Sequence, residues 1–235
     1  SVRVFAPGVY DVQAAPSIAR ASETLSEALG ARLLSPVIDF AMPEAINVKA
    51  LHSALKPFGI RRGRVAGAWK AGLRALEAYR QASRQEGLRI LEEVEQTGEK
   101  AVIVVGRYYN LYDGGVNLEI PRKVSEMGYR VIPYEFLPFS EETLDPFFQN
   151  MFWYYGQRIL AAARFVRERK NLFLLYLTNF SCGPDSFLLT YVDEIMGSKP
   201  SLTLELDEHG ADTGYGTRLE AFADLMAEYE EAPQE

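Results

Sequence analysis

After Gly98, the chain alternates four times between a short apolar segment and a longer segment with helical spacing of apolar residues. Near-continuous apolar strands are typical of a parallel sheet covered on both faces. Four such alternations, with right-handed crossovers, predict a doubly wound α/β domain whose mainly parallel sheet carries helices on both faces. The expected strands cover residues 101–105, 129–135, 173–179 and 202–206, and the expected helices cover 120–127, 145–170, 185–196 and 215–229.

The residues before Gly98 predict a smaller piece of structure. An expected strand at 2–7, a helix at 17–30 and a strand at 31–38 form one β-α-β unit, which makes a poor sheet by itself. We therefore expect residues 1–60 to be a partial α/β unit that forms the end of an upstream domain, with a short helix at 44–56. Since a strand pattern starts almost at the first residue, we expect the chain to begin inside a longer protein.

Residues 61–98 are expected to form a long connecting helix, because apolar residues recur at near-helical spacing over residues 65–96. Its aromatic residues, Trp69 and Tyr79, are expected to belong to a core rather than to contact a cofactor. A Rossmann-like α/β domain then covers 99–230, and a frayed acidic tail covers 231–235.

Composition excludes several classes of protein. The net charge is −7 and the basic residues are spread along the chain, which argues against a nucleic-acid partner. No stretch approaches the roughly 20 apolar residues of a membrane span, so no membrane partner is expected. A single cysteine excludes an internal disulfide, which favours a reducing cytoplasm. The chain also has no Cys/His set with zinc spacing.

That cysteine, Cys182, follows the apolar run 172–177 and precedes a helical pattern. Pro184 and Asp185 are typical of a first helical turn, so the cysteine is expected at the carboxyl end of a strand, the edge where open α/β sheets bind ligands. Unpaired helix N–H groups would stabilise a thiolate there. The alternative is that Cys182 is a small buried core residue.

Two other loops are expected at the same edge, because the carboxyl ends of parallel strands lie together. Residues 106–117 combine glycines, three tyrosines, Arg107, Asn110 and Asn117, yet match no dinucleotide or phosphate-loop motif. Residues 205–214 gather four carboxylates and His209. These carboxylates fit metal ligands, a general acid and base, or helix caps and ion pairs with Arg218, and the residues alone leave the choice open.

The aromatic stretch 150–158 predicts a helix that is apolar on all sides and therefore buried between layers or against another domain.

Several segments together resemble a known family. Residues 106–121 resemble a Gly-Arg-Pro-Tyr-Asn…Asn-x-x-Ile-Pro motif, with Tyr108 in place of the proline. The sequences Tyr-Gly-Gln-Arg-Ile-Leu at 155–160, Thr-Asn-Phe-Ser-Cys-Gly-Pro-Asp-Ser-Phe at 178–187, Leu-Glu-Leu-Asp-Glu-His at 204–209 and Thr-Arg-x-Glu-Ala-Phe at 217–222 complete the pattern. They are similar to the carboxyl-terminal region of the large activator proteins of 2-hydroxyacyl-CoA dehydratases and to double-cubane-cluster proteins. The resemblance is specific over 99–225 and loose over 1–98.

In the wider superfamily, dehydratase subunits and benzoyl-CoA reductases hold an iron–sulfur cluster with cysteines and receive electrons from an ATP-hydrolysing activator. The resemblance implies that Cys182 is one cluster ligand. Since residues 8–16 carry no cysteine, either the other ligands lie upstream of Ser1 in a longer chain or the protein has lost the cluster. The other residues that it implies, around the cluster or in the wall of a substrate site, are Arg107, Tyr109, Asn110, Asn117, Asn179, Ser181, Asp185, Glu205, Asp207, Glu208, His209 and Arg218.

The leading hypothesis is therefore the carboxyl-terminal portion of a dehydratase-activase-related redox protein, inactive as this chain alone. An iron–sulfur cluster is expected in the full-length protein and none on this chain by itself. The expected partners are upstream domains or a partner subunit, an ATP-dependent activator, and a second copy in a homodimer. One rival is a scaffold or docking domain without a cluster, and another is a metal-dependent enzyme that uses Asp207, Glu208 and His209.

Overall fold

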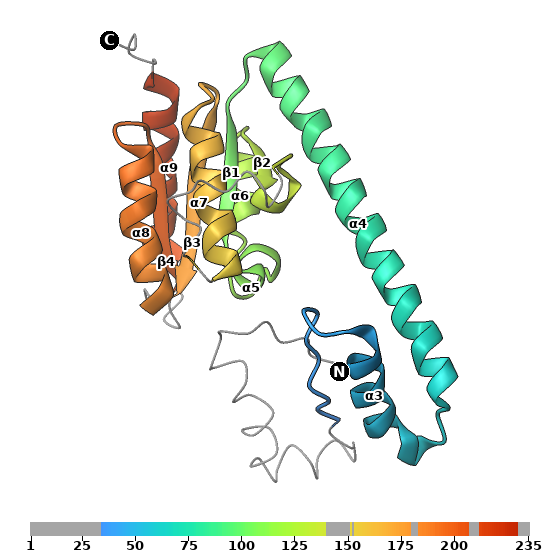
Figure 1. Cartoon of the computed structure of the whole chain (residues 1–235). Coiled ribbons are helices and arrows are strands. Elements are labelled where there is room, and N and C mark those ends of the chain that lie inside the picture. Colours follow the sequence, from blue (N-terminus) through green and yellow to red (C-terminus); the bar gives the residue numbers. More distant parts are fainter. Residues whose placement is uncertain (1–33, 140–150, 152, 180–182, 207–211, 230–235) are drawn as a thin grey trace. The chain divides into compact units, whose positions relative to one another are not determined.

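The computed structural model describes residues 34–139, 151, 153–179, 183–206 and 212–229 (Figure 1). The chain divides into two compact units, one that ends at Tyr79 and one that begins at Arg80. A single helix, α4 (Arg62–Thr97), contributes to both.

The strands that the alternation predicts are all observed, each within a few residues of the expected bounds. They are β1 (Ala101–Gly106), β2 (Arg130–Pro133), β3 (Leu172–Asn179) and β4 (Ser201–Leu206). The helices of the described residues are α3 (Glu44–Leu55), η1 (Lys56–Phe58), α4 (Arg62–Thr97), α5 (Tyr108–Tyr112), α6 (Ile120–Glu126), η2 (Tyr134–Phe136), α7 (Tyr154–Arg167), α8 (Gly183–Met196) and α9 (Asp212–Glu228).

In the first unit, the segment 34–39 packs near α3 without forming a strand. The side chain of Asn47 holds it, since its Nδ2 donates to the Asp39 carbonyl at 2.8 Å and its Oδ1 accepts from the Asp39 amide at 3.0 Å. The predicted strand at 31–38 is therefore wrong for residues 34–38, because the described contacts hold this segment through a side chain and not through a neighbouring strand. Residues 1–33, which carry the rest of the predicted β-α-β unit, lie outside the described residues.

In the second unit, the four strands form an all-parallel sheet in the order β2-β1-β3-β4. The central strands β1 and β3 are buried along nearly their whole length, as their apolar sequences predict. From β1 the chain moves outward to β2, and from β3 it moves outward to β4 in the opposite direction. The predicted doubly wound fold is confirmed, and its topological switch lies between the carboxyl ends of β1 and β3.

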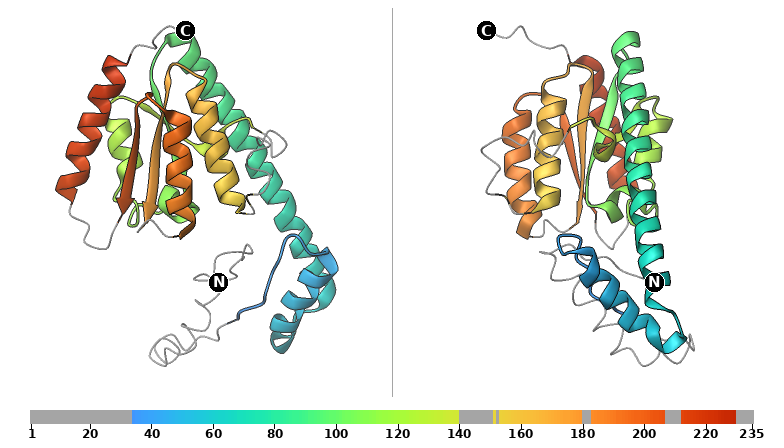
Figure 2. Two further views of the ribbon diagram at one scale, coloured as in Figure 1. Left: turned by 60° about the vertical axis from the view of Figure 1, so that its left-hand side comes forward. Right: turned by 45° about the vertical axis from the view of Figure 1, so that its right-hand side comes forward.

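Helices cover both faces of this sheet. Helices α7 and α8 pack against each other on one face, while α6 and α9 lie on the other (Figures 1 and 2). On that second face, the Tyr129 hydroxyl, just after α6, donates to the Ala223 carbonyl of α9 at 3.1 Å. The last turns of α4 add Ile90, Leu91 and Val94 to the same core.

Helix α7 is shorter than the predicted helix at 145–170. It begins at Tyr154, and the described residues before it, Met151 and Trp153, are not helical. Trp153 has an extended backbone, and the Met151 carbonyl accepts from the Gln157 side chain, so the chain turns into the helix at this point. The prediction that this stretch is apolar on every side is also wrong, since Tyr154 is exposed and the buried side includes the charged Arg158.

Candidate functional site

The carboxyl ends of β1 and β3 approach each other closely. Gly106, the last residue of β1, has φ +150°, and a Cβ atom at this position would lie 2.4 Å from the Leu177 carbonyl oxygen of β3. Only glycine allows this contact without a shift of one strand. The side chains that follow both strands are therefore brought together.

The first group at this switch is a buried ion pair. The Arg107 guanidinium lies 3.1 Å from Asp185 Oδ1, and the side chain of Asp185 is only 3% exposed. The other oxygen, Oδ2, accepts a hydrogen bond from the Thr178 hydroxyl at 2.6 Å. Asp185 also stands in the first turn of α8, where the helix dipole favours a carboxylate. These contacts join the loop after β1, the end of β3 and the start of α8.

The second group is a pair of asparagines that bridge strand ends. Asn110 is fully buried, and its Nδ2 donates to the Leu177 carbonyl at 3.1 Å. Asn179 donates in the same way to the Leu206 carbonyl of β4 at 3.3 Å. In each of them the amide oxygen is buried and has no hydrogen-bond partner, so this edge retains hydrogen-bonding capacity.

A third asparagine, Asn117, has a local role. Its Nδ2 donates to the Leu111 carbonyl at 3.1 Å, and its Oδ1 accepts from the Glu119 amide at 3.1 Å. These bonds stabilise a turn in which Leu118 and Glu119 adopt positive φ angles. Within residues 106–117 the chain forms the short helix α5, and Asn110 lies on its buried side.

The third group is a cluster of aromatic side chains beside the switch. Tyr108 of α5 packs edge-on against Tyr155 of α7, with ring centroids 5.1 Å apart, and stacks on Tyr112 at 6.4 Å. The Tyr112 hydroxyl donates to Glu135 at 2.7 Å. Tyr109, a predicted site residue, is 46% exposed.

Burial changes the acidity of this cluster. It raises the pKa of the Tyr108, Tyr134 and Tyr155 hydroxyls, and the nearby Glu135 carboxylate adds to each increase. Burial also raises the pKa of Glu135 itself, although the Tyr112 hydrogen bond and the charge of Arg158 oppose this. The tyrosines therefore remain neutral donors at ordinary pH.

Sequence reasoning missed Thr178, Tyr134, Glu135 and Arg158 as members of this region. Thr178 and Arg158 lie within the motifs that carry the family resemblance, and that was the available signal. Tyr134 and Glu135 stand directly after β2, so the topology places them at the same edge.

The loop after β4 is only partly described. Arg218 donates to the Thr203 carbonyl at 2.6 Å, and the Glu205 carbonyl accepts from the Tyr215 hydroxyl at 2.9 Å, so neither contact joins the groups between β1 and β3. The remaining predicted site residues lie outside the described residues, and they are Ser181, Cys182, Asp207, Glu208 and His209.

The donor set for a metal or cluster is incomplete on this chain. Within the described residues, no three His, Cys, Asp or Glu side chains are grouped so that they could hold a metal ion. An iron–sulfur cluster is normally held by several thiolates, and the whole chain has one cysteine. A complete cluster site therefore does not fit the chain alone, whereas a contribution of one ligand does. No helix in the described ranges has the length and apolar character needed to cross a membrane.

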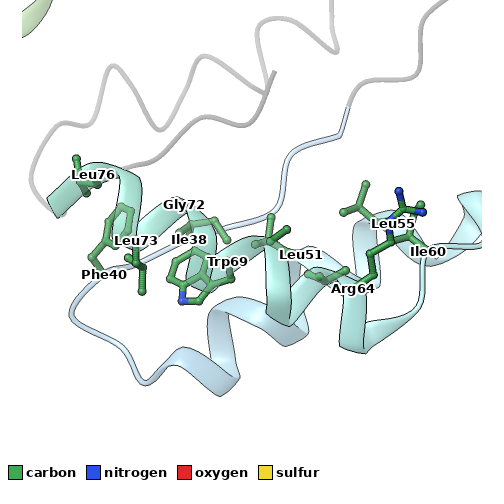
Figure 3. Close-up of a pocket in the computed structure, with 12 residues that line it drawn as sticks. Ile38, Phe40, Leu51, Leu55, Ile60, Arg64, Trp69, Gly72, Leu73 and Leu76 are labelled. Carbon is green, nitrogen blue, oxygen red and sulfur yellow. The ribbon is translucent and has the colours of Figure 1, made fainter. Parts of the chain in front are cut away.

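The first unit contains an apolar cavity of about 530 Å³ (Figure 3). It lies among the segment that includes Ile38 and Phe40, helix α3 and the first half of α4, and Trp69 stacks on Phe40 with ring centroids 5.6 Å apart. The expectation that the aromatic residues of this helix are core residues is wrong for Tyr79, which is 55% exposed. Arg64 is the charged residue in the lining, so the cavity carries no acid–base pair for catalysis.

A comparison with protein families gives one match. The model of the CoA enzyme activase uncharacterised domain (DUF2229) matches residues 5–137, which is more than half of the chain. The matched stretch includes α3, α4, β1 and β2, and it ends before β3 and Cys182. Searches of curated proteins and of solved structures gave no match. The chain thus belongs to the family of the CoA enzyme activase uncharacterised domain.

Proposed function

We propose that this chain is part of a dehydratase-activase-related redox protein in which Cys182 supplies one thiolate ligand of an iron–sulfur cluster. The observation that carries the proposal is the strand order, because the switch between β1 and β3 is the ligand-binding edge of a doubly wound sheet. Cys182 lies in the sequence between the end of β3 at Asn179 and the start of α8 at Gly183. The activase-related family supports the same reading.

The proposed ligand set is shared. Since the chain has one cysteine, the remaining ligands would come from upstream domains of a longer chain or from a partner subunit. Such a cluster, when bound, accepts and donates single electrons, in keeping with low-potential electron transfer or reduction of a small or CoA-linked substrate. An ATP-dependent activator is the proposed electron source.

The residues of the chain have defined tasks in this proposal. Asp185, paired with Arg107 and Thr178, fixes the start of α8 directly after the cysteine. Arg107 adds a positive charge that would stabilise the electron-rich state of a neighbouring thiolate ligand. The side-chain amides of Asn110 and Asn179, whose oxygens are buried, line the edge on either side of β3.

The test is the content of iron and acid-labile sulfide in the natural full-length protein after anaerobic purification. We expect both in the wild type and a loss of both in Cys182→Ser. Thr190→Ala is the control, because Thr190 is exposed on α8 and its change should leave the iron content unaltered. Equal iron in the wild type and Cys182→Ser would refute the ligand role, and the absence of iron from both would favour a scaffold domain without a cluster.

A further inference from the structure

A second feature of the carboxyl edge is the buried cation Arg158 on α7. It is only 9% exposed, and the guanidinium carbon lies 5.7 Å from the ring centroid of Tyr134, 5.3 Å from that of Phe139 and 5.7 Å from that of Tyr154. None of the described carboxylates forms an ion pair with it. Three aromatic faces reduce the cost of burying the charge without supplying an opposite one.

The hydrogen bonds of this cation are also incomplete. Its NH1 group donates to the Tyr154 hydroxyl over a long distance of 3.4 Å, and its buried Nε–H has no acceptor. The hydroxyl of Tyr134 is fully buried and likewise has no partner. These two buried polar groups belong to side chains in contact, since the guanidinium carbon lies 5.7 Å from the centroid of the Tyr134 ring, and each is costly to leave unsatisfied. An added oxygen acceptor would satisfy both.

The surroundings limit what that acceptor can be. Tyr108 and Tyr154 are partly exposed and give the site an aromatic rim, while Arg158 lies deeper. Glu135 is close enough for its charge to interact with that of Arg158. A dianion such as phosphate is disfavoured here, because it costs more to desolvate than a monoanion and is repelled more strongly by Glu135. A carboxylate has one charge and two coplanar oxygens that match the guanidinium edge.

We propose that Arg158, Tyr134 and the aromatic rim bind the carboxylate of a small organic acid. One carboxylate oxygen accepts from the Arg158 Nε–H, and the other accepts from its terminal N–H. The Tyr134 hydroxyl donates to the same group. This site does not depend on the proposed role of Cys182, so either proposal can fail alone.

The experiment is an NMR titration of the complete chain with sodium acetate at pH 7 and constant ionic strength. The Arg158 Nε–H resonance, assigned by its loss in Arg158→Lys, should move downfield and saturate as acetate is added. Sodium chloride should leave it in place, and inorganic phosphate should bind more weakly than acetate. A resonance that does not respond to acetate, or that responds equally to chloride or more readily to phosphate, would overturn the proposal. A resonance already at the shifted position before any addition would also overturn it, because an acceptor of the chain itself would then occupy the site.

Variants separate recognition from a purely structural role. Binding of acetate, followed by the backbone amide of Tyr155, should weaken about 10- to 100-fold in Arg158→Lys and about 5-fold in Tyr134→Phe. Glu135→Gln should tighten binding about 2- to 10-fold, since it removes a repelling charge. Arg169→Lys is the matched control, because Arg169 also lies over one ring, that of Phe165, but is exposed. If Glu135→Gln and Tyr134→Phe both bind acetate as the wild type does, the carboxylate site is excluded even where Arg158→Lys is poorly folded.

Discussion

The two edges of the sheet hold their cationic side chains in different ways. At the amino edge, Lys199 donates to the Val166 and Arg169 carbonyls at the end of α7, and Lys100 donates to the Met226 and Ala227 carbonyls at the end of α9. The Val166 and Arg169 carbonyls also accept from the backbone amides of Arg169 and Leu172, and the helix dipole favours a cation beside carbonyls at a helix end. The lysines of the amino edge therefore serve the stability of the fold, because their ammonium groups bond to backbone carbonyls within the chain.

The carboxyl edge is organised by contacts between side chains. Arg107 pairs with Asp185, while Arg158 has aromatic rings around it. Buried polar atoms without hydrogen-bond partners gather here, and they are Asn110 Oδ1, Asn179 Oδ1, Tyr134 Oη and Arg158 Nε. In the described part of the amino edge there is no such atom. The difference indicates that the carboxyl edge carries polar groups which folding does not use, and function is expected there.

The largest expected effect tests the close approach of β1 and β3 at the carboxyl edge. Gly106→Ala should lower the free energy of unfolding by about 3 kcal/mol, because the new Cβ meets the Leu177 carbonyl and the backbone angle disfavours alanine. Equilibrium unfolding in urea measures this. The control is Gly183→Ala at the start of α8, where a Cβ meets no atom, and its change should stay within about 1 kcal/mol. Equal stability of the two variants would mean that β1 and β3 do not need their close approach.

The next effect belongs to the amino edge. Lys199→Met should destabilise the chain by about 2–3 kcal/mol, because it leaves carbonyls at the end of α7 without their charged donor. It should leave acetate binding at Arg158 unchanged. Lys170→Met, at an exposed neighbouring position, should cost less than about 0.5 kcal/mol. A Lys199 variant that unfolds at the same urea concentration as wild type would show that this edge is not held by its lysine.

A somewhat smaller loss is expected for the ion pair at the carboxyl edge. Arg107→Met should cost about 2 kcal/mol, because it leaves the Asp185 carboxylate buried with the Thr178 hydroxyl as its remaining described side-chain partner. Arg122→Met removes an exposed arginine that pairs with Glu119 and Glu126, and it should cost less than about 0.5 kcal/mol. If the two losses in urea unfolding are alike, Asp185 does not depend on Arg107.

The sequence was sufficient to predict the edge but not the full set of residues on it. The apolar runs of β1 and β3 predicted a parallel sheet, and parallel strands bring the loop of Arg107 next to the start of α8 at Asp185. That placement depends on topology, which the alternation of elements determines. The predicted strand is wrong for residues 34–38, because an apolar pattern marks residues that suit a strand, whereas a stable strand also needs a neighbouring strand to pair with.

Arg158 shows a different limit. Its neighbours in the sequence predicted an apolar buried helix. A single arginine in such a stretch gives no periodic signal from which its contacts could be predicted. Its surroundings come from Tyr134 and Phe139, which lie on another segment of the chain. Side-chain direction and burial decide that contact, and both require the fold.

The smallest expected effect is the dependence of stability on pH that Glu135 gives to the carboxyl edge. The pKa of Glu135 is raised in the folded chain, chiefly by burial, so folding favours its protonated form. The resulting stabilisation is present below the pKa of about 4.5 that the carboxyl has when unfolded and is lost as the pH rises through the higher folded value. Glu135→Gln, which keeps an oxygen to accept from Tyr112, should therefore be more stable than the wild type at pH 7, by less than about 1 kcal/mol because solvent screens the carboxyl. At pH 4 the two proteins should unfold at the same urea concentration. Glu99→Gln, outside this cluster, is the control variant. A Glu135→Gln variant that is less stable than the wild type at pH 7 would mean that the carboxylate stabilises Arg158 more than burial penalises it.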